Sequence, residues 1–313
     1  MSASVLLSLP LVAHAKPQPR AADRTSTSTA TASYSLVRAS SPARTRVYDA
    51  SGRLVATFTD GARSVVLDGP ARTFAEPSTT SARVTSRAWV RLLGTPFAGM
   101  VDLAWLTAAL ADTSPDLIAL GFRYATGAPD QYDGTGTRTA GDASYGPLVD
   151  GVRQEGSDWN DYLGISATYG TTTDRPEADQ LGALDCSGFV RMTFGRLGGV
   201  PMTLEPDGVR LPRRAVQMDT SAPGVLVVRN TGRQVKAFDT LLAGDLVFFD
   251  ASSDDGTAID HVGIYLGVDS SGRRRFLSSR KGADGPTMGD VSGRSTLDGT
   301  GLYATAFRSV RRL

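Results

Sequence analysis

The residues of this chain best suited to covalent chemistry are one cysteine and one histidine. Cys186 lies in the run LDCSGFV (residues 184–190) and is the only cysteine among 313 residues. The chain has two histidines, His14 and His261. A cysteine thiol becomes an effective nucleophile when a neighbouring imidazole removes its proton. Only these two histidines could therefore supply an imidazole partner for Cys186 from within the chain.

We expect Cys186 to lie in the first turn of a helix. The apolar residues after it recur at helical spacing, and Gly198-Gly199 ends the pattern. Asp185 or Ser187 would cap the helix start. Free N–H groups and the helix dipole favour negative charge there, so this position predicts a lowered pKa for the thiol.

His261 opens a run that alternates like a strand, DHVGIYLG (residues 260–267). Gly263 lies two positions further on and is expected to leave open space beside the imidazole. A lone cysteine in a folded protein is usually only a small buried apolar residue. The Asp-Cys-Ser-Gly setting and the histidine strand favour a cysteine hydrolase instead, in which the fold brings the two residues together.

The bulk composition excludes several classes of protein. Lys and Arg total 33 against 32 Asp and Glu, so nothing in the net charge indicates nucleic acid or a membrane surface as partner. A single cysteine forms no intrachain disulfide. One cysteine and two histidines do not supply the ligands of a structural zinc site, and we predict no metal.

The first 43 residues are predicted to stay outside the folded domains. Residues 1–15 resemble a signal peptide, with an apolar run over 5–12 and an Ala-His-Ala cleavage site, although no basic segment precedes it. Cleavage there would remove His14 and leave His261 alone. Residues 16–43 are a Ser/Thr/Pro-rich linker. No later stretch of about 18 apolar residues predicts a transmembrane segment.

The rest of the chain divides into two predicted parts. Residues 44–112 begin with short strands separated by turns such as Asp68-Gly69-Pro70, which predicts a small β module. The module either binds the cell wall or positions substrate, or is an extension packed on the main domain. Residues 113–313 combine a leading helix with several antiparallel strands, an α+β pattern. The irregular connection 127–161 is expected near the substrate groove.

Three ordered blocks carry a resemblance to a known family. The runs 184–190, 243–249 and 260–267, with Leu-Pro-Arg at 211–213 between them, resemble the signature blocks of the NlpC-type cell-wall peptidases. The resemblance covers residues 116–313 and implies a papain-like α+β fold. In that fold the helix bearing the cysteine packs on an antiparallel sheet bearing the histidine.

The same resemblance implies an activity. It indicates a cofactor-free, cysteine-type endopeptidase that hydrolyses peptidoglycan stem peptides, usually between D-glutamate, through its γ-carboxyl, and a diamino acid. Such enzymes are secreted or associated with the cell envelope. We expect a monomer whose partner is peptidoglycan.

The resemblance also implies the site residues. Cys186 and His261 are the catalytic pair, and Ser278 takes the position where the family commonly has a second histidine; Ser279 or a backbone carbonyl could replace it. Tyr169 or Tyr162 would stand in for the family's oxyanion tyrosine. The other predicted substrate-binding residues are Asp185, Ser187 and Asp260.

Serine at the third position leaves other functions open. Serine is shorter than histidine and uncharged, so the chain could be a catalytically weak or inactive relative that binds the cell wall. Acyl transfer, with an amine replacing water in the second step, is a further alternative.

Overall fold

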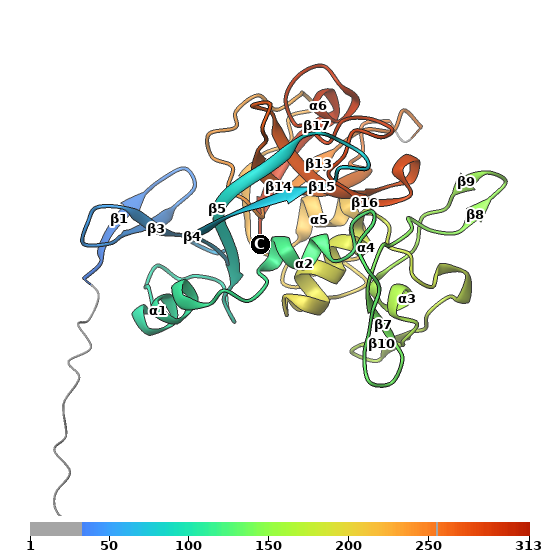
Figure 1. Cartoon of the computed structure of the whole chain (residues 1–313), viewed down its shortest axis with the longest axis horizontal. Helices are drawn as coiled ribbons and strands as arrows, with labels where there is room; N and C mark the ends of the chain where they lie inside the picture. The colour runs from blue at the N-terminus through green and yellow to red at the C-terminus, as the bar shows by residue number, and fades with distance from the viewer. Residues whose placement is uncertain (1–32, 255) are drawn as a thin grey trace, which may run out of the picture. The chain divides into compact units, whose positions relative to one another are not determined.

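The computed structural model describes residues 33–254 and 256–313 (Figure 1). The predicted signal peptide and residues 16–32 of the predicted linker lie outside the described residues. The described chain contains two larger antiparallel sheets with helices packed against them.

The N-terminal sheet has five strands that pair in chain order. They are β1 (Ser35–Ala39), β2 (Arg44–Tyr48), β3 (Leu54–Thr59), β4 (Ser64–Ala75) and β5 (Arg83–Leu92). Helix α1 (Leu103–Ala111) contributes Leu106 to an apolar cluster with Val47, Phe58 and Val65, all fully buried. A small β module is therefore present, as the short alternating runs predict.

Two details of this sheet differ from the sequence prediction. Strand β1 lies within the segment predicted as linker, because the edge of β2 offers it a hydrogen-bonding partner. The predicted turn at 68–70 lies inside β4 as a bulge, where the register with β5 shifts between Asp68 and Arg72. Gly69 has no side chain, so the Trp89 ring packs directly against its backbone.

The second sheet has six strands in the order β12-β17-β13-β14-β15-β16, all paired antiparallel. They are β12 (Val225–Val228), β13 (Leu246–Phe249), β14 (His261–Val268), β15 (Arg274–Arg280), β16 (Gly285–Thr287) and β17 (Phe307–Arg312). Strand β13 is buried throughout, as expected of a central strand with both faces covered.

The remaining helices are short. They are α2 (Leu117–Phe122), α3 (Trp159–Leu163), α4 (Cys186–Val190), α5 (Ala215–Ser221) and α6 (Leu302–Ala306). Helix α4 continues as a π-helical segment, Arg191–Leu197, and packs against β14 and β15. This arrangement confirms the α+β fold class, with the cysteine helix on the sheet that carries the histidine.

The connection between α2 and α4 is irregular and holds only small elements. Its strand pairs are β6 (Gln131–Tyr132) with β7 (Arg138–Ala140), β8 (Leu148–Val149) with β9 (Val152–Arg153), and β10 (Ala167–Tyr169) with β11 (Thr172–Asp174). Single 3-10 turns occur at Ala178–Gln180 here and at Lys281–Ala283 after β15.

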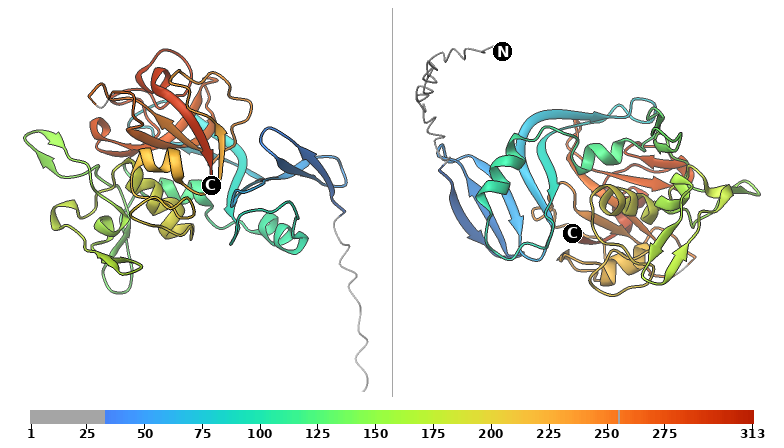
Figure 2. Two further views of the ribbon diagram at one scale, coloured as in Figure 1. Left: turned by 180° about the vertical axis from the view of Figure 1, so that it is seen from behind. Right: turned by 90° about the horizontal axis from the view of Figure 1, so that it is seen from below.

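The β module is joined to the second sheet by a buried carboxylate. Strands β4 and β5 extend from the N-terminal sheet toward the second sheet, where β5 contacts α2 and β14 (Figure 2). Glu76, directly after β4, is 3% exposed. It accepts hydrogen bonds from the Thr287 hydroxyl and from the Met288 N–H, the latter at 2.9 Å. The end of β16 is thus held by the β module.

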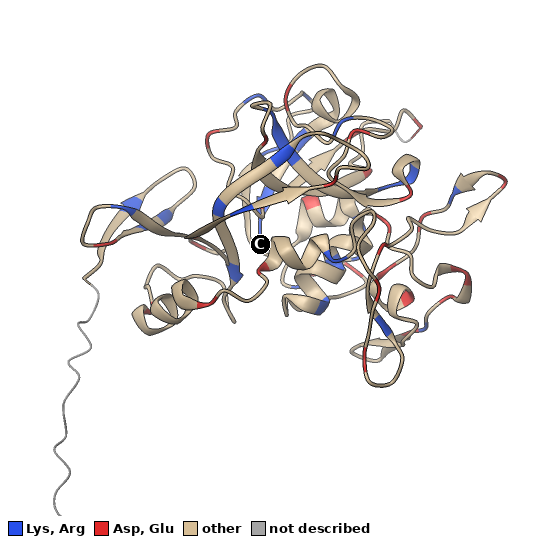
Figure 3. Ribbon diagram, viewed as in Figure 1, with Lys and Arg blue, Asp and Glu red and all other residues tan. Residues whose placement is uncertain are grey.

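Basic and acidic residues are interspersed over the ribbon (Figure 3), in keeping with the near-zero net charge. Within residues 33–254 and 256–313, no helix has the length and apolar run needed to cross a membrane.

Replacing Glu76 tests the junction between the two sheets. Glu76→Ala leaves buried donors on Thr287 and Met288 without an acceptor, so we expect the free energy of unfolding to fall by about 3 kcal/mol. Urea unfolding followed by tryptophan fluorescence measures this. The matched change at the exposed Glu205, Glu205→Ala, should stay within about 0.5 kcal/mol of the unsubstituted protein. Equal effects of the two changes would refute the buried role of Glu76.

Candidate active site

Cys186 is the first residue of α4, as the sequence predicts. The Asp185 carboxylate caps this helix by accepting the Gly188 N–H at 2.7 Å. Any Cβ at Gly188 would lie 2.1 Å from the carbonyl oxygen of Ser157, so only glycine permits this approach. The Asp-Cys-Ser-Gly run therefore combines a cap, the thiol and a close backbone contact.

The sulfur of Cys186 lies against the backbone on both sides of His261. Its thiol donates a hydrogen bond to the carbonyl oxygen of Asp260, with 3.8 Å between the heavy atoms. The Val262 N–H also interacts with the sulfur. These two backbone groups flank His261, and Cys186 and His261 line the same cavity, so the fold brings the two residues to one site at the start of β14.

Ser278 contacts the imidazole, as the resemblance implies. Its hydroxyl lies 3.0 Å from Nε2 of His261, and both side chains are buried. Gly263 does not leave open space, contrary to the sequence expectation. A Cβ there would lie 2.8 Å from the Phe276 ring and 3.1 Å from Cβ of Ser278. The glycine instead lets β15 approach closely enough for Ser278 to reach the ring.

Two aromatic rings hold the imidazole from the side. Tyr303 of α6 lies 5.2 Å and Phe249 of β13 5.7 Å from it, between ring centroids. Arg280 of β15 lies over the Tyr303 ring at 5.2 Å. The histidine is thus fixed by a hydroxyl on one side and by aromatic packing on the other.

Burial keeps both members of the pair neutral at rest. Burial raises the pKa of the Cys186 thiol, and the negative charge of Asp185 acts in the same direction. Burial also lowers the pKa of His261 to about 3, with a further contribution from the Arg280 guanidinium. The prediction that the helix start lowers the pKa of Cys186 is therefore wrong for the resting site, because desolvation outweighs the favourable helix position.

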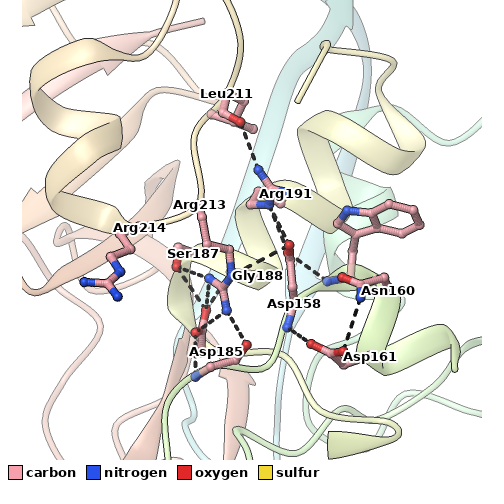
Figure 4. A network of polar contacts seen from close by, with 12 residues as sticks. Asp158, Asn160, Asp161, Asp185, Ser187, Gly188, Arg191, Leu211, Arg213 and Arg214 are labelled. Carbon is pink, nitrogen blue, oxygen red and sulfur yellow. Dashed lines mark hydrogen bonds and ion pairs between the residues drawn. The ribbon is translucent and has the colours of Figure 1, made fainter. Parts of the chain in front are cut away.

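Asp185 is engaged by Arg213, from the Leu-Pro-Arg run. The two side chains form an ion pair at 2.8 Å, and Arg213 also donates to the Ser187 hydroxyl at 2.8 Å (Figure 4). This pairing lowers the pKa of Asp185 although burial opposes it. Asp185 and Ser187 line the cavity described below, and both are tied into this network.

A second buried ion pair lies next to the first (Figure 4). Arg191 is fully buried and contacts Asp158 at 2.8 Å, and its guanidinium also donates to the hydroxyl of Tyr169 at 2.5 Å. That hydroxyl further accepts from the Trp159 indole at 3.0 Å. Tyr169 does not line the cavity, so the structure does not bring this predicted substrate-binding residue to Cys186. Nor does it bring Tyr162, whose hydroxyl donates to the Gly141 carbonyl.

Cys186 and His261 open into one cavity of about 920 Å³. The start of α5, the loop after β13 and the connection between α2 and α4 contribute to its walls. Asp260 also lines it, and the Asp260 carboxylate accepts the N–H groups of Ala251 and Ser252 at 2.7 and 2.8 Å. Ser279, an alternative third residue, donates instead to the carbonyl of Leu184.

Sequence reasoning missed Tyr145, which lines the cavity and is 3% exposed. Burial raises its pKa, and it lines the same cavity as Cys186. Backbone hydrogen bonds pin Ser144 between Gly182 and Leu184. This tyrosine lies 41 positions before the cysteine in the chain, where no spacing rule points to it.

The described residues contain no group of three or more His, Cys, Asp or Glu side chains arranged to hold a metal ion.

Comparison with known proteins finds one family model that matches part of the chain. The model of the NlpC/P60 family matches residues 167–294, which include Cys186, His261 and Ser278. NlpC/P60 proteins are in general hydrolases that act on peptidoglycan. Among curated proteins, none matches the chain.

Three solved structures are similar to the chain at low identity. One, described as similar to a lipoprotein of the NLP/P60 family from Staphylococcus aureus, is 18% identical, with a TM-score of 0.28; the match covers 67% of this chain and 47% of that one. NlpC1 from Trichomonas vaginalis is 12% identical, with coverages of 86% and 76% and a TM-score of 0.31. An NlpC/P60 family protein from Bacillus cereus is 14% identical, with coverages of 89% and 78% and a TM-score of 0.27. The chain thus spans about half the length of the first.

The buried neutral side chain of His261 predicts a pH effect on stability. The pKa of His261 is about 3 in the folded state and about 6.5 when unfolded, so the unfolded chain binds the extra proton between these values. The contribution of His261 to the free energy of unfolding is fully present above pH 6.5 and is lost as the pH drops toward 3. Between pH 7 and pH 4.5 we expect His261 to account for a loss of about 2 kcal/mol.

Urea unfolding of the unsubstituted protein and of His261→Gln at the two pH values measures this loss. The glutamine variant should lose less stability over the same interval. Identical losses in the two proteins would show that His261 is protonated as readily in the fold as outside it.

Proposed function

We propose that this protein is an exported cysteine peptidase that hydrolyses an amide bond in peptidoglycan stem peptides. The observation that carries the proposal is the position of the Cys186 sulfur against the backbone on both sides of His261, inside one cavity. The NlpC/P60 match supports the cell-wall substrate class. The bond we favour joins the γ-carboxyl of D-glutamate to a diamino acid.

The first step transfers the thiol proton to the imidazole. When Nε2 of His261 carries the proton of the neutral ring, it donates to the Ser278 hydroxyl and leaves Nδ1 free as the base. The sulfur then attacks the carbonyl carbon of the substrate. Because both groups are neutral at rest, the ion pair forms during the attack and is stabilised by the Val262 N–H.

The tetrahedral intermediate needs donors for its oxyanion. The N–H of Cys186 is in the first turn of α4, where backbone donors have no acceptor within the helix. The Tyr145 hydroxyl is a second candidate donor, since burial keeps it protonated. The imidazolium next protonates the leaving amine as the C–N bond breaks, and water then hydrolyses the thioester to restore the thiol.

Replacing either member of the pair tests the proposed function. Cys186→Ala and His261→Ala should each lower the release of stem-peptide fragments by at least about 10³-fold, because both act on the same proton transfer. Mass spectrometry of digested sacculi measures the products and identifies the bond. Glu205→Ala, which does not line the cavity, is the matched control.

Thermal unfolding shows whether these variants remain folded. Unchanged fragment release by folded Cys186→Ala and His261→Ala would refute the proposal. Binding of muropeptides without any cleavage by the unsubstituted protein would favour a cell-wall-binding relative.

The Ser278 hydroxyl has a separable effect. Ser278→Ala removes the acceptor that orients the His261 ring, so we expect kcat to fall about tenfold with little change in KM. The matched variant is Ser295→Ala, since Ser295 is also buried but donates to the backbone carbonyl of Gly289. Steady-state kinetics on a synthetic stem peptide distinguishes the two, and equal kcat values would contradict the role of Ser278.

A further inference from the structure

The cations around the cavity differ in how they are engaged. Arg213 is paired with Asp185, and Lys281 is paired with Glu155 at 2.8 Å. Arg280 is 1% exposed and donates to the backbone carbonyls of two glycines. Because these side chains already interact with groups of the protein, they are less available to bind a ligand.

Arg214 is the exception. It lines the cavity and its side chain is exposed. In the described part of the chain, its guanidinium has no ion pair and no hydrogen bond. Figure 4 shows the contrast, with the Arg213 side chain directed into the network around Asp185 and Asp158 and the Arg214 side chain directed away from it.

The local fold does not require arginine at this position. Residue 214 is the N-cap of α5, where a side chain that accepts a hydrogen bond is preferred, and arginine has only donors. The side chain makes no cap hydrogen bond. The Gln217 side chain accepts the backbone N–H of Arg214 at 3.0 Å, and a different residue at 214 would keep that contact.

The acidic side chains that line the cavity already have partners in the protein, which favours binding of an anionic ligand beside Arg214. Glu155 and Asp185 are already paired with cations, and Asp260 accepts two backbone N–H groups. Asp254 also lines the cavity and accepts a hydrogen bond from the Ser253 hydroxyl. A guanidinium presents a planar pair of donors that matches a carboxylate.

We propose that Arg214 binds a free carboxylate of the stem peptide and thereby selects substrates in which that carboxylate is not amidated. This rests on the proposed function, because the ligand is the substrate of the same cavity. Two carboxylates have the required chemistry, namely the α-carboxylate of the D-glutamyl residue and the side-chain carboxylate of the diamino acid.

Binding to a catalytically blocked protein tests the proposal without turnover. In the Cys186→Ala background, Arg214→Gln and Arg214→Lys are titrated calorimetrically with three synthetic stem peptides: unmodified, amidated on the glutamyl residue, and amidated on the diamino acid. Arg210→Gln is the matched control, since Arg210 is exposed, does not line the cavity and is paired with Asp207.

With Arg214 present, we expect one amidated peptide to bind about tenfold more weakly than the unmodified peptide. That peptide identifies the carboxylate. Arg214→Gln should weaken binding of the unmodified peptide by the same factor and leave binding of that amidated peptide unchanged. Arg214→Lys should retain part of the difference in affinity between the two peptides. Equal weakening of all three peptides by Arg214→Gln, or no effect on any, would overturn the proposal.

Kinetics of the active protein separates this proposal from the proposed function. Arg214→Gln should raise KM for the unmodified peptide about tenfold and leave kcat within about twofold. Cleavage of unmodified and amidated peptides with equal kcat/KM would reject the role of Arg214 and leave the peptidase activity standing. Absence of cleavage with every peptide would reject the proposed function, whatever the binding data show.

Discussion

The ion pair between Arg213 and Asp185 is the interaction on which the geometry of the site depends. Asp185 caps the helix that begins at Cys186, and Arg213 holds the cap from a separate segment of the chain. Burying two charges is costly unless their remaining hydrogen bonds are satisfied. Here the second Arg213 nitrogen donates to Ser187, and Asp185 also accepts the Gly156 N–H at 3.1 Å. The position of the sulfur is therefore set by a fully bonded network.

The same burial decides how the pair can work. A solvated thiolate and imidazolium would be stable before substrate binds, but desolvation disfavours both charges here. A neutral pair avoids that cost and is reactive only when the imidazole takes the thiol proton. Ser278, Phe249 and Tyr303 restrict the ring so that little reorganisation is needed for that transfer.

The β module contributes to this arrangement through Glu76. Its carboxylate binds Thr287 and Met288, and Thr287 is the register partner of Ser278 across β15 and β16. The hydroxyl beside His261 thus lies on a strand whose neighbour is held by the N-terminal sheet. This favours the interpretation of the module as an extension packed on the main domain.

The sequence by itself determined the features that depend on short stretches of chain. The helix starting at Cys186, its Asp185 cap and the strand from His261 could be predicted, because capping preferences and strand alternation act over a few residues. The position of Ser278 was implied by the resemblance to the family. Counting cysteines and histidines identified the pair, and the order of the motifs indicated the family.

Only the tertiary structure decided which distant residues share the cavity and what charge they carry. Tyr145 is far from the cysteine in sequence and is brought to the cavity by backbone contacts of Ser144 with Gly182 and Leu184, whereas the Tyr169 hydroxyl is hydrogen-bonded to Arg191. Arg213 and Arg214 are adjacent residues of the same type. Arg213 forms an ion pair with Asp185, whereas Arg214 lines the cavity without a partner in the described chain. Desolvation and long-range pairing depend on the packing of the whole domain, so no local pattern encodes them.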